Sequence, residues 1–341
     1  MAVASGDGVE KLEDMIVRSA ETTSTHIAAA KAAIGAVIFG QELVVERTLI
    51  TVLCGGHGML VGVPGLAKTK LVEALGTVLG LDARRIQFTP DLMPSDILGS
   101  EVLEEGAGGK RAFRFIPGPI FGQLLMADEI NRASPRTQSA LLQAMQEQHV
   151  TVAGSRHDMP KPFHVLATQN PLEQEGTYPL PEAQVDRFML KVIVGYPDKS
   201  EEQMIIRQQV QPIKPAEAQQ VASIFEIIEA RDLVKQVYMD EKIEQYIVDI
   251  VFASRYPDQH NLVKLKGLIN YGASPRGSIN LAMAAKAHAF LQKRGFVIPD
   301  DVKAVCKDVL RHRIGITYEA EAENISTEKI IEDILRSVMV P

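Results

Sequence analysis

The sequence predicts an α/β fold in which a parallel sheet covered by helices precedes a helical second domain. The chain has 341 residues, of which 46% are apolar and 23% charged, a length and composition typical of about two globular domains. Up to Tyr196, short apolar runs alternate with helical patterns, as in parallel sheets covered by helices. After Tyr196 we find only helical patterns, which indicates a second, helical domain.

Charge and cysteine content exclude several classes of protein. The 36 Lys and Arg residues against 43 Asp and Glu residues leave a net charge of −7, which disfavours a dedicated nucleic-acid binder. Cys54 and Cys306 are the only cysteines and lie far apart, so a disulfide framework and a four-cysteine zinc site are excluded and a reducing, cytoplasmic location is expected. We expect no export or targeting signal, because the N-terminus has acidic residues where a signal peptide has a basic start and an apolar run. The uncharged stretch 49–67 holds Pro64 and five glycines, which favours a helix end, a strand and a loop over a membrane span.

The elements follow in order along the chain. A helical lead-in is expected over residues 1–36, and Gly55 and Gly56 suit the end of a helix at 42–53. The first part of the chain then predicts strands at 59–61, 124–127, 164–168 and 188–194 and helices at 69–79 and 137–147. Prolines at 212 and 215 favour a linker over 211–235. Further helices are expected at 201–211, 240–254, 278–293, 299–311 and 327–339.

A glycine-rich loop between a strand and a helix is the strongest local signal. Gly62-Val-Pro-Gly-Leu-Ala-Lys-Thr69 matches the phosphate-binding pattern GxxxxGK[ST] except at Ala67. Backbone N–H groups, the helix N-terminus and Lys68 would bind phosphate, and the Thr69 hydroxyl would bind Mg²⁺. By itself the pattern also fits a glycine-rich turn that opens an ordinary helix.

Two carboxylates follow the apolar strand at 124–127. Asp128 would hold Mg²⁺ and Glu129 would activate the attacking water. Such a pair alone is often just a solvated strand end and helix cap. About 60 residues after a phosphate loop in an alternating chain, it indicates ATP hydrolysis.

Three further residues could serve that reaction. Asn170 follows another strand and could orient the water, although an Asn before proline also simply makes a turn. Arg187 could reach a neighbouring subunit's nucleotide as a finger, or form an ion pair with Asp186 or Glu182. Arg276 lies just inside a helix for which Ser274 suits the N-cap and Pro275 the first position, and it could touch phosphate or be an exposed first-turn arginine.

Together these motifs resemble the MoxR family of AAA+ ATPases over 37–339. The resemblance rests on FGQELV, GVPGLAKT, LLMADEINRASPRTQSALLQAMQE, ATQNP, EGTYPLPEAQVDRF and GASPRG. It implies a five-stranded parallel P-loop core over 37–210 and an all-helical lid over 236–341. The resemblance also implies roles for Lys68 and Thr69 (Walker A), Asp128 and Glu129 (Walker B), Asn170 (sensor 1), Arg187 (arginine finger) and Arg276 (sensor 2). Further nucleotide contacts are expected from Ile38, Gly40, Val63, Pro64, Gly65, Leu66, Ala67 and Lys70. Ala67 is usual in this family.

Two inserted hairpins fit the same resemblance. Strands at 101–103 and 112–116 flank the turn 105–110, and segments 150–152 and 162–165 flank 154–158. They resemble the helix-2 and pre-sensor-1 hairpins of the AAA+ branch that includes the magnesium-chelatase motor and replicative helicases. As isolated features they could also be surface hairpins that pack a loop.

The resemblance implies a ring-forming ATPase, expected as a hexamer, that uses ATP, ADP and Mg²⁺ to remodel a protein client. A partner with a von Willebrand factor A domain is also expected. The alternatives are a metal-chelatase motor subunit and a nucleic-acid motor, the latter suggested by basic residues at the hairpins: Lys110, Arg111, Arg114, Arg156 and Lys161. The acidic whole argues against the nucleic-acid motor. The presence of Glu129 argues against a scaffold that binds ATP without hydrolysing it.

Overall fold

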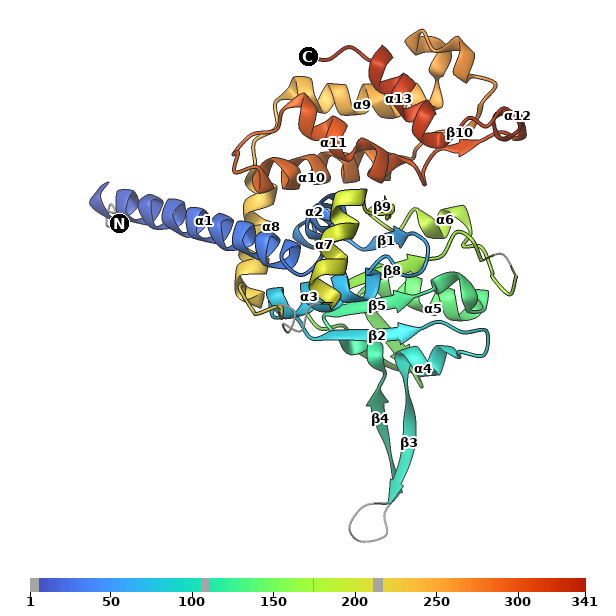
Figure 1. The fold of residues 1–341 in the computed structure, drawn as a ribbon. Coiled ribbons are helices and arrows are strands. Elements are labelled where there is room, and N and C mark those ends of the chain that lie inside the picture. Colours follow the sequence, from blue (N-terminus) through green and yellow to red (C-terminus); the bar gives the residue numbers. More distant parts are fainter. Residues whose placement is uncertain (1–5, 106–110, 174, 211–216) are drawn as a thin grey trace.

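The computed structural model describes residues 6–105, 111–173, 175–210 and 217–341. Figure 1 shows a sheet-containing core with a helical lid on one side, and a hairpin that projects from the opposite side. The long first helix, α1 (Gly6–Gly35), extends outward from the body (Figure 1). Among the described helices, none combines the length and apolar character needed to cross a bilayer.

The predicted parallel sheet is confirmed and has five strands in the order β2-β5-β8-β1-β9, each parallel to its neighbours. These strands are β1 (Gly58–Val61), β2 (Ala83–Gln87), β5 (Leu124–Asp128), β8 (His164–Gln169) and β9 (Leu190–Ile193). Four of them coincide with the predicted apolar runs. The fifth, β2, was not recognised because it is an edge strand in which only Ile86 is buried.

Two hydrophobic cores cover the two faces of this sheet. Side chains alternate along a strand, so Leu124 and Met126 of β5 enter one core while Leu125 and Ala127 enter the other. The helices of the core are α2 (Glu42–Leu53), α3 (Lys68–Leu79), α4 (Pro94–Leu98), α5 (Pro135–Glu147), α6 (Glu182–Val185) and α7 (Lys199–Val210). The first hydrophobic core includes residues of α1, α2 and α3, and the second includes residues of α5.

The lid is helical except for one small sheet. Its helices are α9 (Glu241–Arg255), α10 (Pro275–Leu291), α11 (Pro299–Leu310), α12 (Tyr318–Ala322) and α13 (Thr327–Ser337). The prediction of an entirely helical lid is corrected by β10 (Ile269–Tyr271) and β11 (Gly315–Ile316), which form a short antiparallel pair. These strands have only three and two residues, too few for a recognisable alternation. Short 3₁₀ helices lie at Pro119–Phe121, Ile130–Arg132, Pro257–His260 and Val263–Leu265.

The predicted linker, 211–235, is wrong over its second half. Residues 224–236 form helix α8 (Ile224–Gln236), which begins with a capping box between Ser223 and Glu226. Ile227, Ala230 and Val234 of this helix are buried in the first core. Residues 211–216, which include both prolines of the predicted linker, lie outside the described residues.

The two inserted hairpins are present, one of them with a different second strand. β3 (Gly99–Glu105) pairs with β4 (Arg111–Pro117) as expected, and the turn at 106–110 lies outside the described residues. In the second hairpin, β6 (His149–Val152) pairs with β7 (Ser155–Asp158), not with 162–165. Ala153 and Gly154 both have positive φ, the conformation of a two-residue hairpin turn, and this turn fixes the pairing. Segment 164–165 belongs to β8 instead.

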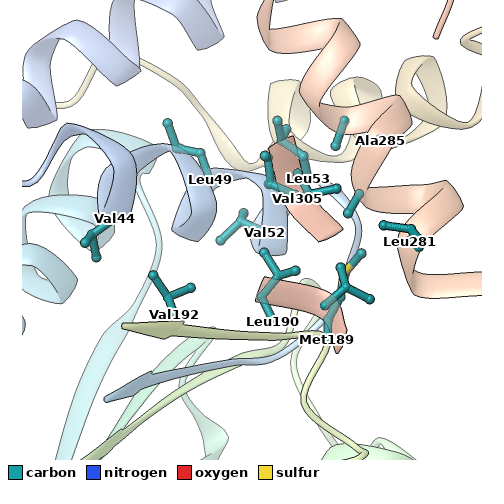
Figure 2. Close-up of a cluster of buried hydrophobic side chains, with 14 of the residues drawn as sticks. Val44, Leu49, Val52, Leu53, Met189, Leu190, Val192, Leu281, Ala285 and Val305 are labelled. Carbon is teal, nitrogen blue, oxygen red and sulfur yellow. The ribbon is translucent and has the colours of Figure 1, made fainter. Parts of the chain in front are cut away.

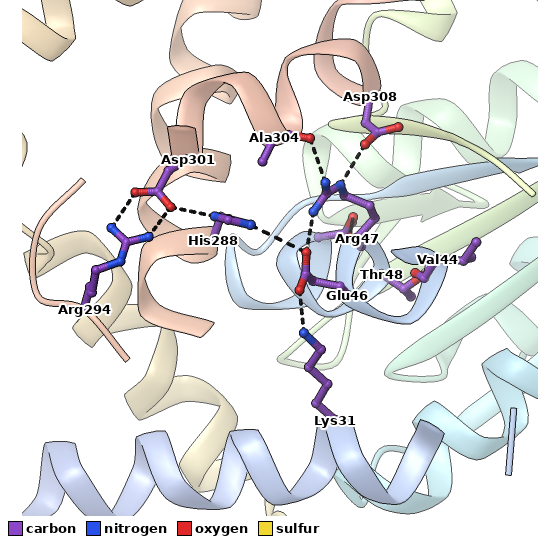
Figure 3. Close-up of polar contacts among 11 residues, drawn as sticks. Lys31, Val44, Glu46, Arg47, Thr48, His288, Arg294, Asp301, Ala304 and Asp308 are labelled. Carbon is purple, nitrogen blue, oxygen red and sulfur yellow. Dashed lines mark hydrogen bonds and ion pairs between the residues drawn. The ribbon is translucent and has the colours of Figure 1, made fainter. Parts of the chain in front are cut away.

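The lid and core share one continuous apolar cluster (Figure 2). The cluster lies where α2 and β9 meet α10 and α11, with Leu53, Leu190, Leu281 and Val305 among its buried members. An ionic network crosses the same boundary (Figure 3). The Arg47 Nε atom of α2 lies 2.8 Å from Asp308 Oδ2 of α11. The buried apolar cluster and the buried Arg47–Asp308 ion pair therefore both hold the lid against α2.

Candidate active site

The phosphate-loop sequence forms a tight turn between β1 and α3. Gly62 cannot carry a side chain, because a Cβ atom there would lie 2.7 Å from the Val194 carbonyl oxygen. Gly65 has a φ of 86°, and Ala67 adopts the left-handed conformation with a φ of 55° directly before α3. Ala67 thus takes the conformation that glycine reaches without steric cost. The N-terminus of α3, with its unpaired N–H groups, is an anion-binding position.

Lys68 lies over this loop. Its ammonium donates hydrogen bonds to the carbonyl oxygens of Gly62 and of Val63, the latter at 3.0 Å. Burial lowers the pKa of Lys68, and the carboxylates of Asp128 and Glu129 oppose that shift. The Lys68 cation is therefore held between the loop and the two acidic residues.

Thr168 of β8 contacts both acidic residues. Its hydroxyl donates to Asp128 Oδ1 at 2.5 Å and accepts the backbone N–H of Glu129 at 2.8 Å. Asp128 ends the buried strand β5, and Glu129 follows with a φ of 55°. The left-handed conformation of a non-glycine residue is uncommon and is often found at functional sites. The sequence assigned no role to Thr168, because its contacts depend on the pairing of β5 with β8.

Three further side chains contact the two carboxylates: Arg85 and Gln87 of β2, and Arg132. The Arg85 guanidinium lies on Asp128 Oδ2, with Nη2 at 2.6 Å and Nε at 3.2 Å. Gln87 donates to Glu129 Oε2 at 2.7 Å, and Arg132 donates to the same oxygen at 2.9 Å. Arg85 and Gln87 were missed by the sequence analysis. Only the position of β2 beside β5 reveals them.

Asn170 makes the turn contact that its position suggested, and it also lies at the cleft. Its Oδ1 atom accepts the N–H of Leu172 at 3.1 Å, which is a turn-forming contact. It is also buried and lines the same cleft as the carboxylates. This cleft has a volume of about 390 Å³. Its lining consists of Pro64, Gly65, Leu66, Ala67, Lys68, Thr69, Lys70, Asp128, Glu129, Thr168 and Asn170.

The donors in this cleft fit a magnesium nucleotide. Thr69 and Asp128 offer a hydroxyl and a carboxylate, the hard oxygen ligands that Mg²⁺ prefers together with phosphate oxygens. Lys68 and the N–H groups of the loop offer positive charge to the phosphates. The residues of this cleft therefore suit both Mg²⁺ and the phosphates of a nucleotide.

Ile38 and Gly40, two of the expected nucleotide contacts, lie elsewhere. Ile38 is buried in the first core. A Cβ atom on Gly40 would lie 2.8 Å from the Glu201 carboxylate and 3.0 Å from Pro197, so Gly40 packs against the start of α7. Val63 contributes its carbonyl oxygen to Lys68, and its side chain packs against the first core. These three residues are not part of the cleft lining.

Arg187 and Arg276 also lie outside the lining of the cleft. Ser274 caps α10 as expected, and Arg276 Nη1 lies 3.2 Å from Asp186 Oδ2. Arg313 pairs with the other oxygen of Asp186 at 2.8 Å. Within the described part of the chain, Arg187 has no ion pair with Asp186 or Glu182. The structure thus places Arg276, together with Arg313, on the carboxylate of Asp186, the residue directly before Arg187, and both predicted arginines lie outside the cleft lining.

Comparisons with known proteins agree with this architecture. Residues 57–190 match the ATPase family associated with various cellular activities (AAA), and residues 266–334 match the AAA lid domain. The chain is 44% identical over 305 residues to the chaperone MoxR1 of Mycobacterium tuberculosis, covering 89% of this chain and 80% of that protein. It is 31% identical over 336 residues to the protein MoxR of Paracoccus denitrificans, covering 92% and 95%.

A solved structure gives the same result. A protein of Cytophaga hutchinsonii, crystallised as a candidate ATPase, superposes with a TM-score of 0.90 at 44% identity and covers 98% of this chain and 100% of its own. Fold, motifs and relatives agree over nearly the whole length. The chain belongs to the MoxR family of AAA+ ATPases.

Proposed function

We propose that the protein hydrolyses ATP in the cleft between the phosphate loop and the ends of β5 and β8. The observation that carries this proposal is Thr168, which holds Asp128 and Glu129 together opposite Lys68 in one cleft. Lys68 would bind the β- and γ-phosphates, and Thr69 and Asp128 would hold Mg²⁺. Bound Mg²⁺ supplies charge neutralisation for the phosphates.

The remaining residues would direct the water. Glu129 would accept a proton from the attacking water, and Asn170 would orient that water. Gln87 and Arg132 both donate to Oε2 of Glu129, so neither contact occupies Oε1, which would accept the proton of the water. The cleft supports this division because Glu129 and Asn170 both line it.

We further infer that subunits assemble into a ring, expected as a hexamer, and that hydrolysis remodels a protein client. Arg187 and Arg276 support assembly, since both lie outside their own cleft, where a neighbour could use them. The named relative MoxR1 is a chaperone. A partner with a von Willebrand factor A domain and a cytoplasmic location remain predictions, the latter in keeping with two free thiols.

The hairpins favour a protein client over nucleic acid. Arg114 pairs with Glu104 at 3.1 Å, and Arg156 pairs with Asp158 at 2.8 Å, so these cations are balanced within their own hairpins. The β3–β4 hairpin instead presents Leu103 opposite Phe113, and Phe113 is 71% exposed. An exposed apolar pair on a projecting hairpin fits a protein surface. Lys110 lies outside the described residues.

The decisive experiment combines turnover with capture. Purified wild-type protein should release phosphate from ATP, and Glu129→Gln should not. Glu129→Gln held with ATP should then retain clients in a pull-down, with Lys68→Ala as the matched control that cannot be trapped. Absence of turnover in an assembled wild-type ring would contradict the ATPase proposal. Retention of DNA or of a chelatase complex would replace the chaperone reading by one of its alternatives.

A further inference from the structure

Arg85 contacts the predicted metal carboxylate, Asp128, although the proposed reaction assigns Arg85 no role. Arg85 and Gln87 lie on the same face of β2, and Gln87 is in register with Asp128 of β5. The Arg85 side chain reaches along this face and places both Nη2 and Nε on Asp128 Oδ2. Its Nη2 atom also donates to Gln87 Oε1 at 3.0 Å.

The two oxygens of Asp128 are held by very different partners. Oδ1 accepts the hydroxyl of Thr168, which is fully buried. Oδ2 accepts the guanidinium of Arg85, whose side chain is 51% exposed. Because Arg85 can turn into solvent and Thr168 cannot, Oδ2 is the oxygen that can be released. A divalent cation at Oδ2 would also lie close to a guanidinium of the same sign, which is unfavourable at such short range.

We propose that Arg85 competes with Mg²⁺ for Asp128, so that the metal must break the Arg85–Asp128 ion pair to bind. This inference rests on the proposed ATP site. The effect is reciprocal, because the metal and Arg85 compete for the same carboxylate. The free energy by which the ion pair stabilises the metal-free state is therefore subtracted from the free energy of metal binding. Removing Arg85 should therefore tighten metal binding by about three- to tenfold, up to about 1.4 kcal/mol, since Arg85 is half-exposed.

The test uses Mn²⁺ as the probe on the full-length, nucleotide-free protein, with free Mn²⁺ measured by electron paramagnetic resonance. Arg85→Ala should lower the Kd for Mn²⁺ by about three- to tenfold relative to wild type. Arg84→Ala is the matched control, because Arg84 is the next residue of β2, lies on its other face and pairs with Asp82 at 3.0 Å. Its Kd should equal that of wild type. Thermal unfolding of each variant should show that the fold is retained.

A double-mutant cycle assigns the effect to the ion pair. In an Asp128→Asn background, Arg85→Ala should leave Mn²⁺ affinity unchanged. Four results would each overturn the proposal. Two of them concern comparisons: an equal gain in affinity in the Asp128→Asn background, or equal affinity in Arg85→Ala and Arg84→Ala. The other two are weaker Mn²⁺ binding by Arg85→Ala than by wild type, and no Mn²⁺ binding by any of the proteins. Because these measurements contain no nucleotide, a failure of ATP binding or turnover in wild type would refute the proposed function separately.

Discussion

Arg276 Nη1 lies 3.2 Å from Oδ2 of Asp186, the residue directly before Arg187. The contact joins the start of α10 in the lid to the core segment that leads into β9. Arg313, whose side chain is nearly inaccessible to solvent, holds Asp186 from the other side at 2.8 Å. The buried pair therefore fixes this edge, while Arg276 stays half-exposed. An edge with two arginines outside their own cleft is suited to complete a neighbour's site.

Mixing two inactive variants should restore activity if Arg187 acts on a neighbour. Arg187→Ala should bind ATP normally and hydrolyse it about 10³- to 10⁵-fold more slowly. Lys68→Ala should be inactive because its loop is defective, although it keeps its arginine. In a 1:1 mixture about one interface in four pairs an intact loop with an intact arginine, so up to about a quarter of the wild-type rate should return in a phosphate-release assay.

Subunit exchange must be verified for this experiment, for example by energy transfer between labelled subunits. If exchange occurs and no activity returns, Arg187 acts within its own subunit or only structurally. Arg132 and Arg136 would then be the next candidates. Arg132 already pairs with Glu129 of its own chain at 2.9 Å, so Arg136 would be tested first.

Lys68 and Glu129 should separate binding from turnover. Lys68→Ala should weaken ATP binding by at least about tenfold, since the loop loses its ammonium. Glu129→Gln should keep the Kd for ATP within about twofold and lower kcat by about 10²- to 10⁴-fold. A fluorescent ATP analogue and a phosphate-release assay measure the two quantities. Glu147→Gln, at the end of α5, is a control that should change neither. Equal loss of binding in both variants would contradict the assigned roles.

The sequence predicted the residues of the site better than their contacts. Apolar runs identified four strands, because β1, β5, β8 and β9 lie inside the sheet or are covered by the lid. Edge strand β2 has charged and polar side chains, so no periodicity identifies it. Arg85 and Gln87 were therefore missed.

Strand order could not be predicted from local patterns, and it decides the contacts. Thr168 lay within a predicted strand, yet its bridge to Asp128 requires that β8 lie next to β5. Helix α8 was missed for a related reason: its three buried residues are stabilised by α1 and α2, which are far away in sequence. The motifs were predictable because backbone geometry fixes the spacing of the loop residues.

Buried histidines should make the protein less stable at mildly acidic pH. Burial, together with the nearby Arg231 cation, lowers the pKa of His57 to about 4 and that of His164 to about 3. Unfolded histidine has a pKa near 6.5, so below that pH the unfolded state binds more protons than the folded state. Stability should be complete above pH 6.5 and fall toward pH 4. Each histidine accounts for at most about 2 kcal/mol between pH 7 and pH 5.

Urea unfolding at pH 7, 6 and 5 measures this loss. His57→Asn should start from a lower stability at pH 7, because His57 accepts the N–H of Val165 at 3.0 Å, but should lose less on acidification. The same pH dependence in His57→Asn and wild type would show that His57 does not remain neutral in the folded state.

Breaking the Arg47 contact should loosen the lid. Arg47 is buried between α2 and α11 and also donates to the Ala304 carbonyl at 2.7 Å. Arg47→Ala should lower the free energy of unfolding by about 2 to 4 kcal/mol, somewhat less than for a fully orphaned charge, because Arg311 still pairs with Asp308 at 2.8 Å. Lys303→Ala breaks an exposed pair with Asp300 and should change stability by less than about 1 kcal/mol. Denaturant unfolding compares them, and equal effects would show that the network does not hold the lid.

Thr168 should matter through its hydroxyl alone. Thr168→Val keeps nearly the same volume in the buried strand, but it removes the donor to Asp128 and the acceptor for the N–H of Glu129. With the Asp128 carboxylate and the backbone of Glu129 free to shift, kcat should fall by about ten- to a hundredfold, or about 1.4 to 2.7 kcal/mol in activation free energy. The unpaired N–H should also cost about 1 to 3 kcal/mol of stability, which denaturant unfolding measures.

Thr168→Ser retains the hydroxyl and loses one methyl group, so it should hydrolyse ATP at close to the wild-type rate although it too is less stable. The two variants thus separate a folding defect from a loss of carboxylate positioning. If valine supports the wild-type rate, or if serine fails as badly as valine, the bridge does not position the carboxylates for catalysis.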